Sequence, residues 1–330
     1  MATTSRAIDR RGGGDTAPQV GSVLAGRYRL QTPHPIASGC FEATDEATGE
    51  RVLVKTGPRE RLEREAGLLS ALDHPGIARL ERSPGDDSSS FIVLEWIDGV
   101  DLEALFARHQ EPLPDALLIE LLWRLSEAVA AIHAAGWLYR DLKPANVVVR
   151  ADGAPVIVDL GAALPIGQAF EPPPDSDVTD GYGAPEQYLT DAPEGPWTDV
   201  YGLGAIGYRA LCGRPPVPAP ARLRGEAMAL AMEAAGRHAE SLCRAVDWAL
   251  ALDAAARPPT VRDWSAALRI SADEAGAPAE PDKRLPPSAP AAPPAFDDYP
   301  PTVRVRRAPQ AKVARSAAVT PTSPAARSTR

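Results

Sequence analysis

Along the chain, the spacing of hydrophobic residues changes from short runs to long helical stripes. Three short runs, at residues 26–30, 40–44 and 51–55, are separated by turn signals, and residues 47–50 favour a hairpin turn. A compact apolar run follows at 91–96. Runs of this length between turn residues are typical of strands, so we predict a β-rich N-terminal region.

Later stretches have the spacing of helices. Residues 59–72 place leucines on one stripe amid charges, which predicts an amphipathic helix. Residues 117–132 keep helical spacing for about five turns and predict a mostly buried helix. A hairpin is predicted at 147–158, and 197–270 looks helical throughout. Strands followed by helices predict an α+β protein with two lobes, one rich in strands and one rich in helices.

Composition separates the two ends of the chain from its centre. Proline totals 35 residues, and twelve of them lie in 271–330 among alanines and scattered hydroxyl residues. Such a segment cannot bury enough apolar surface to offset the entropy of ordering, so we predict a disordered Pro/Ala-rich tail there. The tail is basic, with nine Lys or Arg against six Asp or Glu. Residues 1–21 are predicted to be a flexible leader.

Charge and cysteine content exclude several classes of protein. The formal net charge is −9, and because both ends are slightly basic the centre, 22–270, is more acidic still, so no specific nucleic-acid binding is predicted. Cys40, Cys212 and Cys243 lack the spacing of a zinc site or a disulfide framework. Neither a signal-peptide core nor an apolar stretch of about 18–20 residues is found, so we expect a cytoplasmic protein without a transmembrane segment.

The most informative motif is Tyr-Arg-Asp-Leu-Lys-Pro-Ala-Asn at 139–146, followed by Asp-Leu-Gly at 159–161 and Ala-Pro-Glu at 184–186. Each motif alone is a weak signal, but their order and spacing are specific. Together they resemble the catalytic core of the bacterial, eukaryotic-like Ser/Thr protein kinases over about residues 26–270. The resemblance implies a bilobal protein kinase fold at 22–270, with a small β-rich N-lobe to about residue 97 and a larger α-helical C-lobe from about residue 98.

The resemblance also implies an activity and its catalytic residues. A kinase of this family transfers the γ-phosphoryl group of Mg-ATP to Ser or Thr hydroxyls of protein substrates, including its own. Asp141 would orient the hydroxyl or accept its proton, and Lys143 would contact the γ-phosphate. Asn146 and Asp159 would hold Mg²⁺, or Mn²⁺ in its place, because hard cations prefer oxygen ligands. Tyr139 stands where His is commonest in the family.

Further residues are implied to bind the nucleotide and to stabilise the site. Lys55 would hold the α- and β-phosphates and pair with Glu65, the best match because it has the family's spacing to His74. Glu60 and Glu63 are nearby alternatives. The adenine would lie beside the gatekeeper residue, Leu94, and bind the backbone of the hinge, Glu95, Trp96 and Ile97. Structural roles are also implied for three residues. Asp199 would anchor the backbone of the catalytic loop, and Glu186 and Arg257 would form a buried ion pair.

The sequence departs from the family at the roof of the nucleotide site. The three expected glycines of the phosphate-binding loop align with Pro33, Pro35 and Ser38. Glycine lets the backbone approach phosphates and donate N–H groups, whereas proline has no N–H to donate. In addition, Cys40 replaces the usual valine, and Leu53 replaces the small alanine above the adenine.

These departures leave three interpretations open. The first is a working kinase with a non-standard phosphate lid. The second is a pseudokinase that acts as a binding or scaffold module. The third is a small-molecule phosphotransferase that shares the fold, which the residues typical of protein substrates disfavour: Lys143, Glu186 and Arg257.

Regulation is predicted at the segment between Asp159 and Glu186. In kinases with an arginine at the position of Arg140, a phosphate on this segment often orders it through charge-assisted hydrogen bonds. Ser176 and Thr179 are the candidate acceptors. Ser176 lies between two aspartates that could partly replace a phosphate, and Thr179 aligns with a threonine that contacts the catalytic residues.

The tail offers a second kind of partner besides protein substrates. It resembles the proline-rich extension that follows many bacterial Ser/Thr kinase domains. A phosphothreonine in it could recruit a phosphopeptide-binding domain; the candidate acceptors are Thr302, Thr320, Thr322 and Ser323. The alternative is an inert, solubilising tail.

Overall fold

The computed structural model describes residues 19–34, 39–82, 91–108, 113–168, 178–236 and 238–274. These residues belong to one compact unit, Met1–Asp282. The second unit, Lys283–Arg330, lies outside the described residues, and so does most of the predicted leader. The predicted disorder of both ends therefore stays a prediction.

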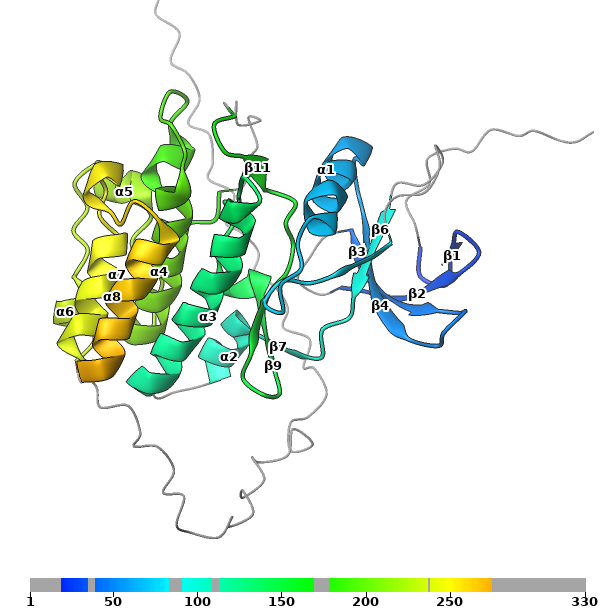
Figure 1. Cartoon of the computed structure of the whole chain (residues 1–330), viewed down its shortest axis with the longest axis horizontal. Helices are drawn as coiled ribbons and strands as arrows, with labels where there is room; N and C mark the ends of the chain where they lie inside the picture. Colours follow the sequence, from blue (N-terminus) through cyan, green and yellow to red (C-terminus); the bar gives the residue numbers. More distant parts are fainter. Residues whose placement is uncertain are drawn as a thin grey trace, which may run out of the picture. The chain divides into compact units, whose positions relative to one another are not determined.

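The N-terminal part of the described chain, to residue 95, forms a six-stranded antiparallel sheet in the order β1-β2-β3-β4-β6-β5 (Figure 1). Its strands are β1 (Val23–Leu24), β2 (Tyr28–Pro33), β3 (Cys40–Asp45), β4 (Arg51–Thr56), β5 (Leu80–Arg82) and β6 (Phe91–Glu95). Alternate side chains of these strands are buried together on one side of the sheet, as a period of two requires; they are Tyr28, Leu30, Ala43, Val52, Val54, Phe91 and Val93. The four predicted runs are confirmed as strands.

Among the described residues, one helix packs against this sheet. Helix α1 (Arg59–Ser70) begins after Pro58, whose φ of −57° suits the residue before a first turn, and it ends two residues before the predicted bound. Its buried face carries one ionisable group, Glu65, among apolar neighbours. Figure 1 shows α1 beside the strands, and its contacts with β5 and β6 hold this face against the sheet.

Two short sheets carry the loops that follow. Strands β7 (Gly99–Asp101), β9 (Val147–Arg150) and β10 (Pro155–Ile157) form one, and the predicted hairpin at 147–158 is confirmed as β9 and β10. Strand β8 (Trp137–Leu138) pairs with β11 (Leu164–Pro165) in the other. The motif at 139–146 thus lies between β8 and β9, and Asp159 lies between β10 and β11.

The remaining chain is mostly helical. Its helices are α2 (Leu102–Arg108), α3 (Asp115–Ala134), η1 (Pro144–Asn146), η2 (Pro185–Tyr188), α4 (Pro196–Cys212), α5 (Ala219–Leu223), α6 (Ala231–Ala234), α7 (Glu240–Ala249), η3 (Ala254–Ala256) and α8 (Val261–Glu274). The expectation of helix throughout 197–270 is wrong for several connecting stretches, among them residues 213–218, 224–230, 250–253 and 257–260; glycines or prolines interrupt the pattern in most of them. Among the described residues, no helix is long and apolar enough to cross a bilayer.

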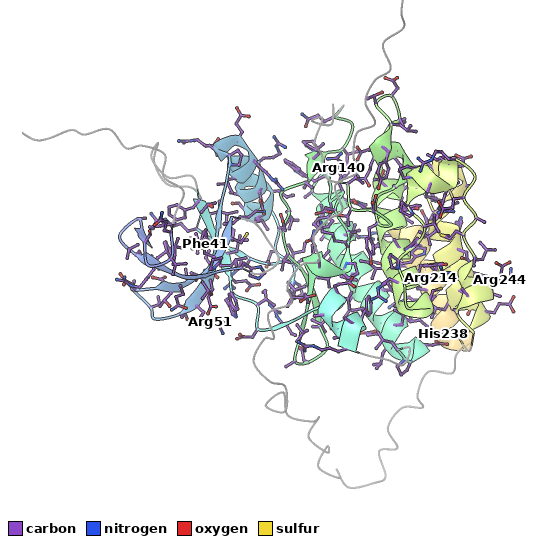
Figure 2. The ribbon with its side chains drawn as sticks, turned by 180° about the vertical axis from the view of Figure 1, so that it is seen from behind. Phe41, Arg51, Arg140, Arg214, His238 and Arg244 are labelled. Atoms are coloured by element: carbon purple, nitrogen blue, oxygen red, sulfur yellow. The ribbon has the colours of Figure 1, made fainter. Side chains whose placement is uncertain are left out.

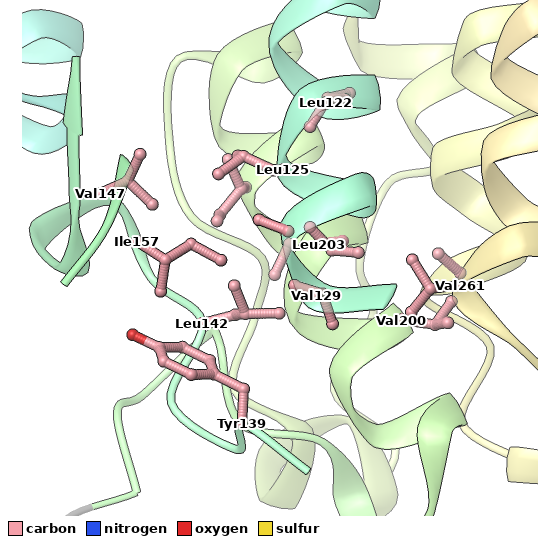
Figure 3. Packing of buried hydrophobic residues seen from close by; sticks show 14 of the residues in the cluster. Leu122, Leu125, Val129, Tyr139, Leu142, Val147, Ile157, Val200, Leu203 and Val261 are labelled. Atoms are coloured by element: carbon pink, nitrogen blue, oxygen red, sulfur yellow. The ribbon is translucent and has the colours of Figure 1, made fainter. Parts of the chain in front are cut away.

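The large core lies where α3, α4 and α8 meet the loops of the site. Figure 3 shows side chains of α3 packed with those of α4 and α8 and with Tyr139 and Leu142 of the motif loop. Leu117, which the sequence assigned to the buried stripe of α3, is 60% exposed, so the buried face begins at Leu118. The motif loop is therefore anchored to the core by its buried side chains, Tyr139 and Leu142.

A glycine in α4 allows this loop to lie close to the helix. A β-carbon added to Gly202 would lie 2.7 Å from the β-carbon of Leu142, closer than two carbon atoms can pack. Leu142 is itself buried and follows Asp141 directly. The absence of a side chain at Gly202 thus fixes how near the motif loop comes to the core.

Candidate active site

A buried ion cluster joins three distant parts of the sequence. The ammonium of Lys55, on β4, lies 2.8 and 2.6 Å from the two carboxylate oxygens of Glu65, on α1. It also lies 2.5 Å from Oδ1 of Asp159. The side chains of Lys55 and Glu65 are 9% and 1% exposed, so water screens this attraction little. The structure thus brings together the three residues that the resemblance placed around the phosphates.

Within this cluster, Lys55 and Asp159 stabilise each other's charged form, whereas burial raises the pKa of Glu65. Burial alone would lower the pKa of Lys55, but the charges of Asp159 and Glu65 outweigh it and raise the pKa. Burial would likewise raise the pKa of Asp159, and the charge and hydrogen bond of Lys55 reverse the effect and lower it. Lys55 and Asp159 are therefore both charged at neutral pH.

The motif loop forms a second cluster of polar side chains. Nζ of Lys143 donates to both carboxylate oxygens of Asp141, at 2.9 and 2.8 Å, and to the hydroxyl of Thr179 at 3.1 Å. Nδ2 of Asn146 donates to Oδ2 of Asp141 at 2.8 Å and to its backbone carbonyl at 2.9 Å. Two nitrogen donors thus fix the orientation of the Asp141 carboxylate, and the hydroxyl of Thr179 is engaged within the site.

Backbone anchors hold this loop in an uncommon conformation. The buried carboxylate of Asp199, on α4, accepts the backbone N–H groups of Tyr139 and Arg140 at 2.8 and 2.7 Å, and Nε2 of His133 lies 2.7 Å from it. Arg140 and Asp159 have φ of +72° and +66°, a region that side chains other than glycine rarely adopt. The bonds to Asp199 offset the strain at Arg140.

A second buried ion pair joins Arg257, which follows η3, to Glu186 in η2. The guanidinium of Arg257 donates to both oxygens of Glu186, at 2.8 and 2.9 Å. It also donates to three backbone carbonyls, so all five of its N–H donors are used; the acceptors are Ala251, Leu252 and Trp197. Thr198 donates to the same carboxylate at 2.8 Å. Glu186 is therefore a fully paired buried charge.

The residues expected around the adenine lie on β3, β4 and β6. In the sheet register Leu53 pairs with Leu94, and the side chain of Leu94 is buried. Glu95 ends β6 and donates its backbone N–H to the carbonyl of Arg79. Trp96 and Ile97 follow β6 and are only half-buried. The backbone of 95–97 therefore links the sheet to β7, as a hinge would.

Cys40 lies opposite Lys55 in the sheet register and is buried. Burial raises the pKa of its thiol to about 11. The thiol is therefore protonated at neutral pH, which makes it a poor nucleophile.

The phosphate lid can be described only in part. Pro33 pairs with Phe41 at the end of the β2–β3 hairpin, and residues 35–38, which include Pro35 and Ser38, lie outside the described residues. Gly39 has φ of +76°, and a β-carbon there would lie 2.8 Å from the carbonyl oxygen of Thr56. This position therefore requires glycine, because the chain makes a left-handed turn there and any side chain would collide with the backbone of β4.

Several residues of the site escaped the sequence prediction. Gln187 donates to the carbonyl of Arg140 at 2.9 Å, and Arg61 donates to the carbonyl of Gly161 at 3.0 Å. Glu194 forms an ion pair with Arg140. These contacts span 47, 100 and 54 positions in sequence, so no local pattern could reveal them. Ser176, the other regulatory candidate, lies outside the described residues.

The oxygen atoms of this site suit a hard cation. The hydrogen bonds of Asn146 use its nitrogen, and those of Asp159 use Oδ1, which leaves one oxygen of each side chain for a metal. Within the described part of the chain, no three His, Cys, Asp or Glu side chains gather around one point. Two protein oxygens suit Mg²⁺, which completes its coordination with nucleotide and water oxygens.

The fold and these two clusters define the class of protein. A family model described as the protein kinase domain matches residues 37–258, and the chain belongs to this family. The chain also resembles a solved structure titled "PpkA-294 apo form" with a TM-score of 0.63 and 23% identity, covering 77% of this chain and all of the other. That likeness supports the bilobal kinase fold.

Curated relatives narrow the family. The chain is 35% identical over 222 residues to serine/threonine-protein kinase PknA of Mycobacterium tuberculosis, covering 61% of this chain and 50% of the relative. It is 32% identical over 223 residues to serine/threonine-protein kinase pkn2 of Myxococcus xanthus, covering 60% of this chain and 26% of the relative. The chain thus spans about half the length of the first relative and resembles bacterial Ser/Thr kinases.

Proposed function

We propose that this chain is a serine/threonine protein kinase that transfers the γ-phosphoryl group of ATP to protein hydroxyls, including its own. One observation carries the proposal: the Lys55–Glu65–Asp159 cluster and the Asp141–Lys143–Asn146 cluster coexist in a single arrangement. The pseudokinase interpretation rests on the lid and on Leu53, and it offers no reason for both clusters to be so fully bonded.

In this proposal Asp141 orients the substrate hydroxyl. Lys143 and Asn146 donate to its carboxylate and hold it in place, so the reacting oxygen would meet a preorganised acceptor. Lys143 would neutralise charge on the transferring group as it leaves the nucleotide. Thr179 donates to Asp141 at 3.4 Å and links this cluster to the segment that ends at Glu186.

The nucleotide would be held from the sheet. Lys55 would bind the α- and β-phosphates, and Glu65 would keep its ammonium in place. When bound, Mg²⁺ would supply positive charge that offsets the charge of the phosphates. Asn146 and Asp159 would supply its protein ligands, and the backbone of 95–97 would receive the adenine. Because the lid lacks N–H donors at its prolines, the proposal places more of the phosphate binding on Lys55.

Partners and compartment follow from the same activity. Protein substrates are required, and a phosphorylated tail would offer a site for a phosphopeptide-binding domain. The three cysteines are free. Reduced thiols and a need for ATP both fit the cytoplasm, where we place the kinase domain.

The test compares the purified wild type with Asp159→Asn for transfer of labelled phosphate from ATP with Mg²⁺ to itself and to a generic basic protein. The substitution removes the charge that pairs with Lys55 and binds metal, so we expect transfer to fall to the assay background. Thermal melting of both proteins checks that the fold is intact. Transfer by neither folded protein, even with an added activating partner, would instead favour the pseudokinase.

A further inference from the structure

Arg140, the residue before Asp141, makes an ion pair outside the expected regulatory segment. Its Nε lies 2.5 Å from Oε2 of Glu194, and its second terminal nitrogen lies 2.7 Å from Oε1. The side chains of Arg140 and Glu194 are 9% and 16% exposed. A two-pronged pair in this setting is stronger than an exposed one, because both hydrogen bonds are charge-assisted and little water competes.

The same guanidinium reaches the segment that must be ordered for catalysis. Its remaining terminal nitrogen donates to the carbonyl of Ala162 at 3.2 Å, one residue after the Asp-Leu-Gly motif (Arg140 is labelled in Figure 2). Arg61 of α1 donates to the preceding carbonyl, that of Gly161, at 3.0 Å. Two arginines thus hold successive carbonyls at the start of the segment.

Glu194 is itself held in position by the chain around it. It lies between Pro193 and Gly195, two residues before the first residue of α4, and the backbone N–H of Gly195 donates to Thr198 at 3.2 Å. Thr198 bonds in turn to the buried carboxylate of Glu186. The backbone beside Glu194 is therefore tied to the start of α4 and to the far end of the segment, and not to its start at residues 161–162, which Arg140 and Arg61 contact.

We propose that Glu194 is a positioning residue that provides Arg140 with negative charge from within the chain, so that the start of the segment 159–186 is ordered without phosphorylation. The proposal rests on the kinase activity proposed above. A phosphate would supply negative charge from the segment itself and would be removable. A carboxylate fixed before α4 supplies it permanently.

The experiment compares the full-length wild type with Glu194→Gln and with Asp191→Asn, a matched loss of one negative charge. Asp191 is exposed on the same loop and has no ion pair within the described residues. Wild type is first treated with a phosphatase, and mass spectrometry checks that residues 159–186 carry no phosphate. We expect this wild type to keep its kcat within about twofold, and Asp191→Asn to match it.

Glu194→Gln is expected to lower kcat by about tenfold to 100-fold with little change in the KM for ATP, because Asp141 is misplaced while the nucleotide contacts persist. Hydrogen–deuterium exchange of residues 160–166 should become faster in Glu194→Gln but not in Asp191→Asn. In an Arg140→Gln background, Glu194→Gln should change neither exchange nor kcat further, because Glu194 acts through Arg140.

Three results would overturn the proposal: a tenfold or larger loss of wild-type kcat on phosphatase treatment, equal behaviour of Glu194→Gln and Asp191→Asn, or additive effects with Arg140→Gln. If wild type transfers no phosphate at all, the proposed function fails. The exchange measurement still decides the role of Glu194, because it does not depend on catalysis.

Discussion

At the scale of single residues, the ion pairs range from buried pairs with full hydrogen-bond partners to exposed pairs on the surface. Arg257 and Glu186 belong to the first kind, with side chains 0% and 5% exposed. Arg244 and Glu240 belong to the second, at 70% and 63%. The difference matters because removing one member of a buried pair leaves an uncompensated charge, whereas water replaces an exposed partner.

We therefore expect Arg257→Ala to lower the free energy of unfolding by about 3–5 kcal/mol. Arg244→Ala, at the outer edge of the helices in Figure 2, should change it by less than about 0.5 kcal/mol. Urea denaturation of both variants measures the difference. Equal losses would show that Glu186 finds another partner when Arg257 is removed.

The sequence predicted residues that lie inside ordered motifs better than those that act across the fold. Lys55, Asp141 and Asp159 could be assigned because motif order and spacing give each a role. The contact of Glu194 with Arg140 could not, because it depends on how the loop before α4 packs against the motif loop. The roles assigned to the predicted site residues stay predictions until kinetics tests them.

At the scale of elements, period and turn residues predicted strands and helices well where the pattern was strong. The runs that became β2, β3, β4 and β6 are bounded by turns, and α1 has a clear apolar stripe. The stretch after α4 was predicted less well, because its alanines favour helix while its prolines prevent it. The pattern thus predicted whether a stretch is a strand or a helix more reliably than the residues at which it begins and ends.

Two glycines in helices should respond in opposite ways to alanine. In Gly202→Ala the new methyl group would collide with Leu142, so we expect a loss of about 1–3 kcal/mol of stability and reduced phosphate transfer as Asp141 moves. In α1, Gly67 is exposed with open space around it, so Gly67→Ala should add about 0.5–1 kcal/mol. Thermal melting measures the stability of both variants, and a transfer assay measures the activity of Gly202→Ala. A Gly202→Ala variant more stable than the wild type would contradict the prediction, because the motif loop would then have moved away from α4 without cost.

At the scale of the whole molecule, buried neutral groups make the fold sensitive to alkali. Burial raises the pKa of two cysteines to about 11, those of Cys40 and Cys243. It raises the pKa of five tyrosines above the ordinary value, namely Tyr139, Tyr182, Tyr188, Tyr201 and Tyr208. In the unfolded chain these groups would lose their protons at lower pH than in the folded one.

Stability should therefore be flat near neutral pH and fall above about pH 9, because the folded state then binds more protons than the unfolded state. Lys55 acts in the same direction, since its raised pKa adds stability that is present below about pH 10.5 and lost above it. A fully buried group such as Tyr139 contributes at most about 1.4 kcal/mol per pH unit. Urea denaturation at pH 7, 9 and 10.5 measures this fall, and a constant value would contradict it.

The Arg140–Glu194 pair bears on how the kinase activity proposed for this protein could be switched off. A switch set by a removable group can be reset by an enzyme that removes the group. No phosphatase can remove a carboxylate that is part of the chain. If Glu194 acts as proposed, the output would be limited by how much of the protein is made, by the supply of substrate, and by how quickly its products lose their phosphates. Control would then lie in synthesis and turnover rather than in activation.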